Sequence, residues 1–136
     1  MAQKEFIANV KELPQVICFI EGELDKFNVD SKTMMQFQLA MEELFVNIAT
    51  YSYPDKNDGK CQITIQYDQE KQEIILKVED NGIKFNPLKK EDPNTNLSAE
   101  EREVGGLGIF IVKETMDSVE YQYENQKNIL TLRKKV

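Results

Sequence analysis

The sequence predicts an α/β (α+β) fold of the two-layer sandwich type, in which helices cover one face of a mostly antiparallel mixed sheet. Two observations lead to this prediction. Two early segments place apolar residues at helical spacing, and two later segments alternate apolar and polar residues as paired strands do. Along the chain, the predicted order of elements is β-α-α-β-β-loop-α-β-β.

The chain is expected to open with a strand and a helix. Residues 4–10 have the composition of a first strand. Residues 13–27 carry an apolar stripe at helical spacing, and Pro14 suits the first turn of a helix because its missing N–H would have no partner there.

A second helix is expected to be the longest element. Asp30 or Ser31 provides its N-cap, and the helix is expected to run to about Ser52 because Pro54 marks a stop. Its buried face is expected to consist of Met34, Met35, Leu39, Met41, Leu44, Phe45 and Ile48.

A hairpin follows this helix. Residues 62–67 and 73–78 alternate as strands, and residues 68–71 form the turn between them. Asp80-Asn81-Gly82 ends the second of these strands.

The last part of the chain is predicted to hold a polar loop, a helix and a closing hairpin. Residues 85–104 are polar and long for a connection in a compact domain, which indicates a functional or mobile segment such as a lid. Residues 105–116 change from glycine-rich to helical, and residues 119–123 and 128–133 alternate as paired strands.

Length and charge exclude several classes of function. At 136 residues the chain fits one domain, expected to span residues 1–136. Its formal charge of −7 argues against nucleic acid or an anionic membrane as the general partner. There is no apolar run of about 18 residues and no signal-peptide core, so a cytoplasmic location is expected. With no histidine, the chain cannot form a Ser-His or Cys-His nucleophile system or phosphorylate itself on histidine.

A carboxylate and an amide share one face of the second predicted helix. Glu43 and Asn47 are four residues apart, in line with Tyr51. Phosphoryl transfer from a metal nucleotide needs an oxygen ligand for Mg²⁺, which Asn47 can supply, and a base or water-positioning group, which Glu43 can supply. The alternative is that both are solvated residues on the outer face of an amphipathic helix, as Glu42 is expected to be.

Asp80 closes an apolar strand two residues before Gly82. Its carboxylate can accept a hydrogen bond from the exocyclic amine of adenine, while Gly82 lets the backbone come close to a flat ring. The alternative is that Asp80 is a turn residue only.

Gly105, Gly106, Leu107 and Gly108 immediately precede an apolar helical run. Their backbone N–H groups and the positive end of the helix would converge on a phosphate without any basic patch. A glycine cluster alone is weak evidence for a phosphate site, and the sequence contains neither a P-loop nor a Rossmann unit. Basic residues in or beside the polar loop would either neutralise phosphates or be solvated: Lys84, Lys89, Lys90 and Arg102.

In this order and spacing, the three segments resemble the sequence boxes of the GHKL ATPase superfamily, and within it the bacterial anti-sigma factors that are also serine/threonine protein kinases. The boxes are Glu-x-x-x-Asn at residues 43–47, Asp-x-Gly-x-x-Phe-Asn-Pro at residues 80–87 and Gly-Gly-x-Gly at residues 105–108. The resemblance covers nearly the whole chain and implies the histidine-kinase-like ATPase (Bergerat) fold.

The resemblance also implies roles for individual residues. Glu43 would be the general base, Asn47 the protein ligand of Mg²⁺ and Asp80 the adenine contact. The glycines at 105–108 would bind phosphate and form the hinge of a lid over ATP, to which residues 100–104 would lead. The expected nucleotide-binding residues are Asn47, Asp80, Gly82, Gly105, Gly106, Leu107 and Gly108.

The sequence departs from the family pattern at two places. Family members often have a histidine four residues after the asparagine and a glycine next to it, where this chain has Tyr51 and Ser52. The Gly-Thr that often opens the last strand is replaced by Lys127-Asn128-Ile129, so no ligand residue is expected on that strand.

The resemblance thus implies a protein that binds Mg·ATP, phosphorylates a serine or threonine of a STAS-type anti-anti-sigma protein and sequesters a sigma factor. Two alternatives stay open: an ATP/ADP-sensing module that switches partners without transferring phosphate, and the stand-alone ATPase domain of a histidine-kinase-like system. No direct contact with nucleic acid or membrane is expected. The sequence gives no oligomeric state, although family members are commonly homodimers.

Overall fold

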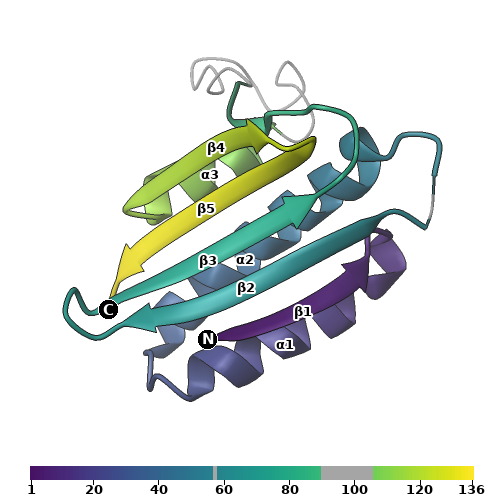
Figure 1. The fold of residues 1–136 in the computed structure, drawn as a ribbon. Helices are drawn as coiled ribbons and strands as arrows, with labels where there is room; N and C mark the ends of the chain where they lie inside the picture. Colours follow the sequence, from purple (N-terminus) through teal and green to yellow (C-terminus); the bar gives the residue numbers. More distant parts are fainter. Residues whose placement is uncertain (57, 90–105) are drawn as a thin grey trace.

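The chain folds into a helix layer and a sheet layer (Figure 1). The computed structural model describes residues 1–56, 58–89 and 106–136, and the statements below refer to these. The sheet has the strand order β1-β2-β3-β5-β4, and each neighbouring pair is antiparallel. Its strands are β1 (Ala2–Ile7), β2 (Lys60–Asp68), β3 (Glu73–Asp80), β4 (Ser118–Glu124) and β5 (Lys127–Lys135).

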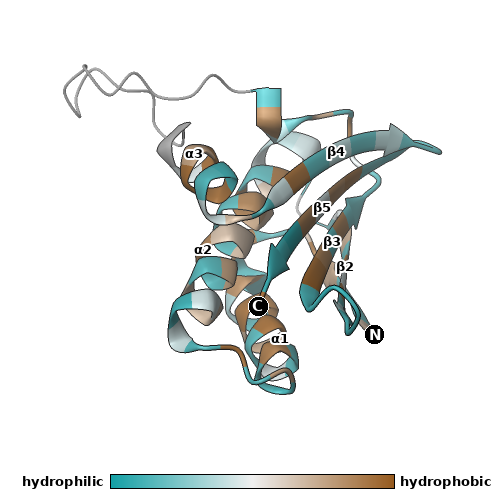
Figure 2. Cartoon of the chain, turned by 90° about the vertical axis from the view of Figure 1, so that its left-hand side faces the viewer, coloured by the Kyte–Doolittle hydropathy of each residue, from teal (hydrophilic) through white to brown (hydrophobic). Residues whose placement is uncertain are grey.

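Three α-helices cover one face of this sheet, as predicted (Figure 2). They are α1 (Leu13–Asp25), α2 (Ser31–Asn47) and α3 (Gly106–Thr115), and α2 packs against both of the others. The apolar side chains of the helices and of the strand faces that point toward them form one core. None of the described helices combines the length and the apolar composition needed to cross a membrane.

Both predicted hairpins are confirmed, β2 with β3 and β4 with β5. Asn125 and Gln126 connect β4 to β5, and both have positive φ angles, 54° and 62°. A two-residue turn with this geometry matches the twist of the strands it joins.

The second predicted helix also has the predicted ends. Asp30 Oδ1 accepts a hydrogen bond from the backbone N of Thr33 at 2.7 Å, so Asp30 is the N-cap of α2. At the other end α2 continues into a π-helical turn, Ile48–Ser52. Turns of this kind occur frequently at functional sites.

The first strand begins at Ala2, two residues before the predicted start, and it also ends earlier than predicted. It stops at Ile7 instead of residue 10, because the Asn9 side chain accepts a hydrogen bond from Lys11 N at 3.0 Å and caps the 3-10 turn Val10–Glu12. An asparagine that bonds its own local backbone competes with strand pairing. The helix α1 that follows ends at Asp25, two residues before the predicted end.

The prediction of the buried face of α2 was wrong for two residues. Met35 and Leu39 are 53% and 49% exposed. The buried stripe keeps the helical spacing i, i+3, i+4, i+7, i+8, i+11 but starts from another residue, and it consists of Phe37, Ala40, Met41, Leu44, Phe45 and Ile48. Met35 and Leu39 each lie two residues from Phe37, on the far side of the helix.

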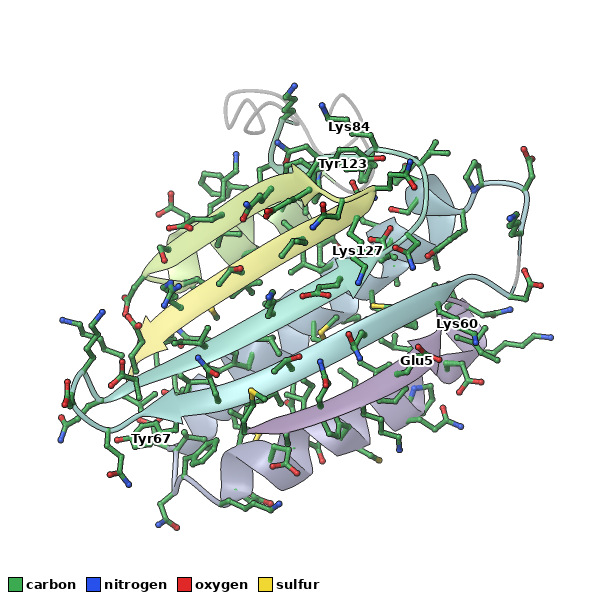
Figure 3. The ribbon with its side chains drawn as sticks, viewed as in Figure 1. Glu5, Lys60, Tyr67, Lys84, Tyr123 and Lys127 are labelled. Carbon is green, nitrogen blue, oxygen red and sulfur yellow. The ribbon has the colours of Figure 1, made fainter. Side chains whose placement is uncertain are left out.

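The outer face of the sheet has no described helix over it and carries polar and charged side chains (Figure 3). Glu5 and Lys60 from neighbouring strands form an ion pair there, with 3.6 Å between the carboxylate oxygen and the ammonium nitrogen. The buried side chains of the strands point the other way, toward the helices. At one end of the sheet, register aligns a buried row across four strands: Phe6, Cys61, Asp80 and Asn128.

Candidate functional site

Glu43 and Asn47 lie one turn apart on α2 and are hydrogen-bonded. Asn47 Nδ2 donates to the Glu43 backbone O at 2.7 Å and to Glu43 Oε1 at 3.0 Å. Asn47 is only 4% exposed, whereas Glu43 is half-buried and Glu42 is exposed. Burial therefore excludes a solvated surface position for Asn47. Because the amide nitrogen faces Glu43, the amide oxygen of Asn47 points away from that carboxylate.

The first turn of α3 comes up against Glu43. Helix α3 begins at Gly106, so Gly106, Leu107 and Gly108 belong to its first turn, while Gly105 lies outside the described residues. A Cβ added at Gly108 would lie 2.2 Å from Glu43 Cδ and from Oε2. Glycine at 108 therefore allows the carboxylate to approach the end of α3 where the helix N–H groups have no acceptor within the helix itself and the helix dipole is positive.

Asp80 is buried at the end of β3 with 4% exposure. Its Oδ1 accepts hydrogen bonds from the backbone N of Gly82 and from Asn128 Nδ2, both at 2.9 Å. Burial raises the pKa of the Asp80 carboxyl above its usual range, and the hydrogen bonds from Asn128 and Gly82, together with the influence of the Ser52 hydroxyl, oppose this shift. The bond from Gly82, two residues on, is the local contact expected of a turn residue, and the bond from Asn128 is an additional contact from a distant strand.

Gly82 has a structural reason to be glycine that the sequence did not indicate. A Cβ added there would lie 2.3 Å from the backbone O of Ser52, at the end of the π-helical turn. The next residue, Ile83, donates its backbone N–H to the same Ser52 oxygen at 2.9 Å. The close approach seen in the structure is therefore to the helix end, and an approach to a ligand ring stays a prediction.

Tyr51, which stands where the family often has histidine, contacts the second segment. Its ring stacks on Phe85 with the ring centroids 5.0 Å apart and the planes inclined by 28°. The tyrosine remains 43% exposed. This pair ties the turn after α2 to the segment that follows Asp80.

One continuous helical segment thus contacts both of the other boxes. Glu43 meets Gly108 at one end, and Ser52 meets Gly82 at the other. Ser52 comes nine residues after Glu43, about 13 Å along the helix axis. The two ends border separate hollows: one of about 350 Å³ lined by Glu43 and Gly108, and one of about 300 Å³ lined by Ser52 and Gly82.

Tyr53 holds this end of the sheet together and was not singled out from the sequence. Its hydroxyl donates to the backbone O of Lys60 at 2.7 Å and accepts from Asn81 N at 2.9 Å. Its ring lies so close to Gly59 that an added Cβ there would be 2.4 Å from the ring. Only the long-range arrangement of the chain reveals this role.

Asn128 was also missed, because no ligand residue was expected on the last strand. It lies at the start of β5, directly opposite Asp80, and is 2% exposed. The departure from the family pattern therefore places a buried amide beside the carboxylate of the second box.

The basic residues near the polar loop are only partly described. Lys84 is exposed, with its Nζ 5.3 Å from the centroid of the Tyr123 ring (Figure 3). Lys89 is exposed at the end of the 3-10 turn Pro87–Lys89. Lys90 and Arg102 lie outside the described residues, as does most of the predicted lid.

The donor atoms of the site fit magnesium better than a metal that needs several protein ligands. Within residues 1–56, 58–89 and 106–136, no three His, Cys, Asp or Glu side chains gather as a metal centre. Magnesium commonly takes one or two protein oxygens and completes its shell with water and phosphate. The amide oxygen of Asn47 suits such a role.

Comparison with known proteins connects this geometry to a family. Serine-protein kinase RsbW of Listeria innocua serovar 6a is 23% identical over 115 residues, which cover 82% of this chain and 72% of that protein. Serine/threonine-protein kinase BtrW of Bordetella bronchiseptica is 26% identical over 94 residues, covering 69% of this chain and 65% of that protein.

Solved structures share the fold. The histidine kinase domain of a blue-light activated histidine kinase from Erythrobacter litoralis superposes with a TM-score of 0.56 at 11% identity, covering 94% of this chain and 60% of that one. Acinetobacter baumannii histidine kinase AdeS gives a TM-score of 0.54 at 16% identity, covering 99% of this chain and 68% of that one. The sequence pattern of the family described as "Histidine kinase-like ATPase domain" matches residues 6–134. The resemblance in the sequence is thereby confirmed, and the chain belongs to the histidine kinase-like ATPase domain family.

Proposed function

We propose that this chain binds Mg·ATP, phosphorylates a serine or threonine of a STAS-type anti-anti-sigma protein and sequesters a sigma factor in the cytoplasm, as a homodimer. The observation that supports this best is the placement of Glu43 and Asn47 on the one helical segment that touches both Gly108 and Gly82. The names of the relatives, serine and serine/threonine protein kinases, agree with the proposed reaction.

Each box has a distinct task in this proposal. Asp80 reads the base at one end of the site, and the first turn of α3 receives the phosphates at the other. Asn47 offers its amide oxygen to the metal. When bound, Mg²⁺ neutralises charge on the phosphate oxygens.

Glu43 serves the transfer step. As the hydroxyl oxygen of the substrate serine forms its bond to the γ-phosphorus, its proton passes to the Glu43 carboxylate. The bond between the γ-phosphorus and the bridging oxygen breaks, and ADP leaves. The hydrogen bond from Asn47 Nδ2 to Oε1 fixes the carboxylate for this role.

Nucleotide binding tests the first half of the proposal. At a concentration of Mg·ADP 100 times its dissociation constant, the free energy of unfolding should rise by about 2.7 kcal/mol. For a chain of this length the melting temperature should rise by an amount on the order of 10 °C. Thermal melts with Mg·ADP, and with ADP plus EDTA, measure the rise and its dependence on the metal.

Asn47→Ala should lose most of the metal-dependent part of this stabilisation. Gln38→Ala, at a polar position on the same helix that pairs with Glu21 instead, is the matched control and should behave as wild type. A melt that neither ADP nor ATP shifts in the presence of Mg²⁺ would contradict the proposal.

Gly108→Ala tests whether glycine at this position is required for folding or for phosphoryl transfer. The added methyl displaces only the flexible end of Glu43, and alanine favours helix over glycine by up to about 1 kcal/mol, so the stability in urea should be kept or raised. Phosphoryl transfer should fall because the displaced carboxylate no longer meets the substrate hydroxyl. Gly22→Ala in α1 is the control, since an added Cβ there meets nothing within 4 Å and transfer should be unchanged. Wild-type transfer by Gly108→Ala would show that the position of Glu43 does not matter.

A further inference from the structure

Asn128 and Asp80 form a buried pair across two strands. They lie directly opposite each other in the pairing of β5 with β3, although 48 residues separate them in sequence. Their exposures are 2% and 4%. Directly opposed residues in antiparallel strands have their Cβ atoms about 5 Å apart, close enough for side chains to bond.

The amide of Asn128 uses all of its hydrogen-bonding capacity. Nδ2 donates to Asp80 Oδ1 at 2.9 Å and to the Ile83 backbone O at 2.8 Å. Oδ1 accepts from the Phe85 backbone N at 3.0 Å and from the Tyr121 hydroxyl. An amide has two donor hydrogens and two acceptor lone pairs, so none is left for a ligand. A reversed amide would set its oxygen against two acceptors, so the orientation is determined by its surroundings.

Both hydrogen bonds from Gly82 and Asn128 reach Asp80 at the same atom, Oδ1. Two donors occupy the two lone pairs of that oxygen. The other oxygen, Oδ2, is therefore the atom of the carboxylate that is left to accept from a ligand.

Ser52 places a second polar atom beside this carboxylate. A Cβ added at Gly82, the residue whose N–H bonds Asp80 Oδ1, would lie 2.7 Å from Ser52 Cβ, so the Ser52 side chain starts next to the contact between Gly82 and Asp80. Ser52 is 2% exposed, and its hydroxyl opposes the rise in the pKa of Asp80. No group of the described residues meets Ser52 Oγ with hydrogen-bond geometry. A buried polar atom without a partner indicates a place for water or ligand. A hydroxyl donor next to a carboxylate acceptor matches adenine, which presents an exocyclic amine next to a ring nitrogen acceptor.

We propose that Asn128 is a positioning residue for base recognition, which occupies Asp80 Oδ1 so that Oδ2 faces the exocyclic amine of the base beside the Ser52 hydroxyl. This inference rests on the proposed nucleotide site. Asn128 does not touch the base itself, because its amide is fully used. The same amide holds the backbone at Ile83 and Phe85, so one side chain fixes both the carboxylate and the segment that follows it.

The simpler alternative is that Asn128 only holds the segment 83–85 in place. The two explanations are distinguished by changing the protein and the ligand separately and together, as in a double-mutant cycle. The affinities of wild type and Asn128→Leu are measured for Mg·ADP and for the diphosphate of purine riboside, which lacks the amine. Wild type should prefer ADP, and in Asn128→Leu this preference should shrink roughly tenfold, a coupling within the range of groups that share one hydrogen-bond network. A clamp alone would weaken both ligands equally and leave the preference unchanged, which would overturn the inference.

Three further variants keep the test decisive. Leu130→Ala, two residues along the same face of β5 and also buried, controls for general destabilisation and should leave the preference as in wild type. If Asn128→Leu does not fold, Asn128→Asp keeps the shape and the acceptor for Phe85 N but loses the donor to Asp80, and it should narrow the preference in the same way. If that variant also fails to fold, Tyr121→Phe removes one bond to the amide and should narrow the preference to a smaller extent, and an unchanged preference there would also overturn the inference.

The measurements distinguish a failure of the proposed function from a failure of the inference about Asn128. Wild type that binds neither nucleotide would contradict the proposed function, and this inference with it. Wild type that prefers ADP, together with folded variants that keep the full preference, would contradict the role of Asn128 alone.

Discussion

Glu43→Gln should lower the rate of phosphoryl transfer by about 10²- to 10⁴-fold, the usual contribution of a positioned acid or base, while nucleotide affinity stays close to that of wild type. Glutamine has the same shape and its amide oxygen can still accept from Asn47 Nδ2, but it cannot take the proton of the substrate hydroxyl. Single-turnover transfer from Mg·ATP and equilibrium binding of Mg·ADP measure the two quantities separately.

Glu42→Gln provides the matched control because Glu42 is the exposed neighbour on the same turn of α2. Its transfer rate should equal that of wild type. A Glu43→Gln variant that transfers phosphate at the wild-type rate would remove Glu43 from the reaction. Equal losses in both variants would point to a general effect of charge.

Asp80→Asn should weaken ATP binding by about 10- to 150-fold, the cost of losing a hydrogen bond to a charged group. An asparagine oxygen can still accept from Gly82 N and Asn128 Nδ2, so the amide group would take the place of Oδ2. An NH₂ donor in the place of Oδ2 cannot accept from the exocyclic amine of adenine, but it can donate to the carbonyl oxygen that the bases of GTP and ITP carry instead. GTP and ITP should therefore lose far less affinity than ATP, or gain. Unchanged preference for ATP in competition titrations would show that Asp80 does not read the base.

The same substitution should not harm the fold at neutral pH. Burial raises the pKa of Asp80 in the folded chain, so the folded state holds this proton more tightly than the unfolded state does. Protonated Asp80 therefore stabilises the folded state. This contribution to the free energy of unfolding is complete below the unfolded-state pKa of Asp80 and is lost as the pH rises through its folded-state pKa. Asp80→Asn should thus be at least as stable as wild type at neutral pH, and its advantage should disappear on acidification. Urea unfolding of wild type and Asp80→Asn, at neutral pH and at acidic pH, measures this difference in stability.

Local signals in the sequence were sufficient for most of the fold. Asp30 caps α2 with its own side chain, and the alternation in β2 and β3 reflects one buried and one exposed face. The errors arose where several local patterns competed. Met35 and Leu39 fit a helical stripe as well as Phe37 does, and only packing against the sheet selects the face that is buried. At Asn9, a side-chain hydrogen bond to the local backbone ended β1 early.

In the candidate site, too, local sequence signals indicated some residues, and only the fold revealed others. Glu43 and Asn47 were indicated because helix geometry alone places them together, and their hydrogen bond follows from that spacing. Asn128 and Tyr53 were not, because they reach the site through strand register and contacts between distant segments. The glycines show a related limit. The cluster at 105–108 indicated a phosphate site, but the contact of Gly108 with Glu43 is identified only by the three-dimensional structure.

Transfer of phosphate from Mg·ATP to a STAS-domain protein of the same organism tests the proposed kinase activity most directly. Mass spectrometry of the STAS protein after incubation should find one phosphorylated serine or threonine, formed only with Mg²⁺ and absent when that residue is replaced by alanine. If the STAS protein stays unphosphorylated while the chain demonstrably binds Mg·ATP, the proposed kinase activity is wrong, and the chain is a nucleotide-sensing switch instead.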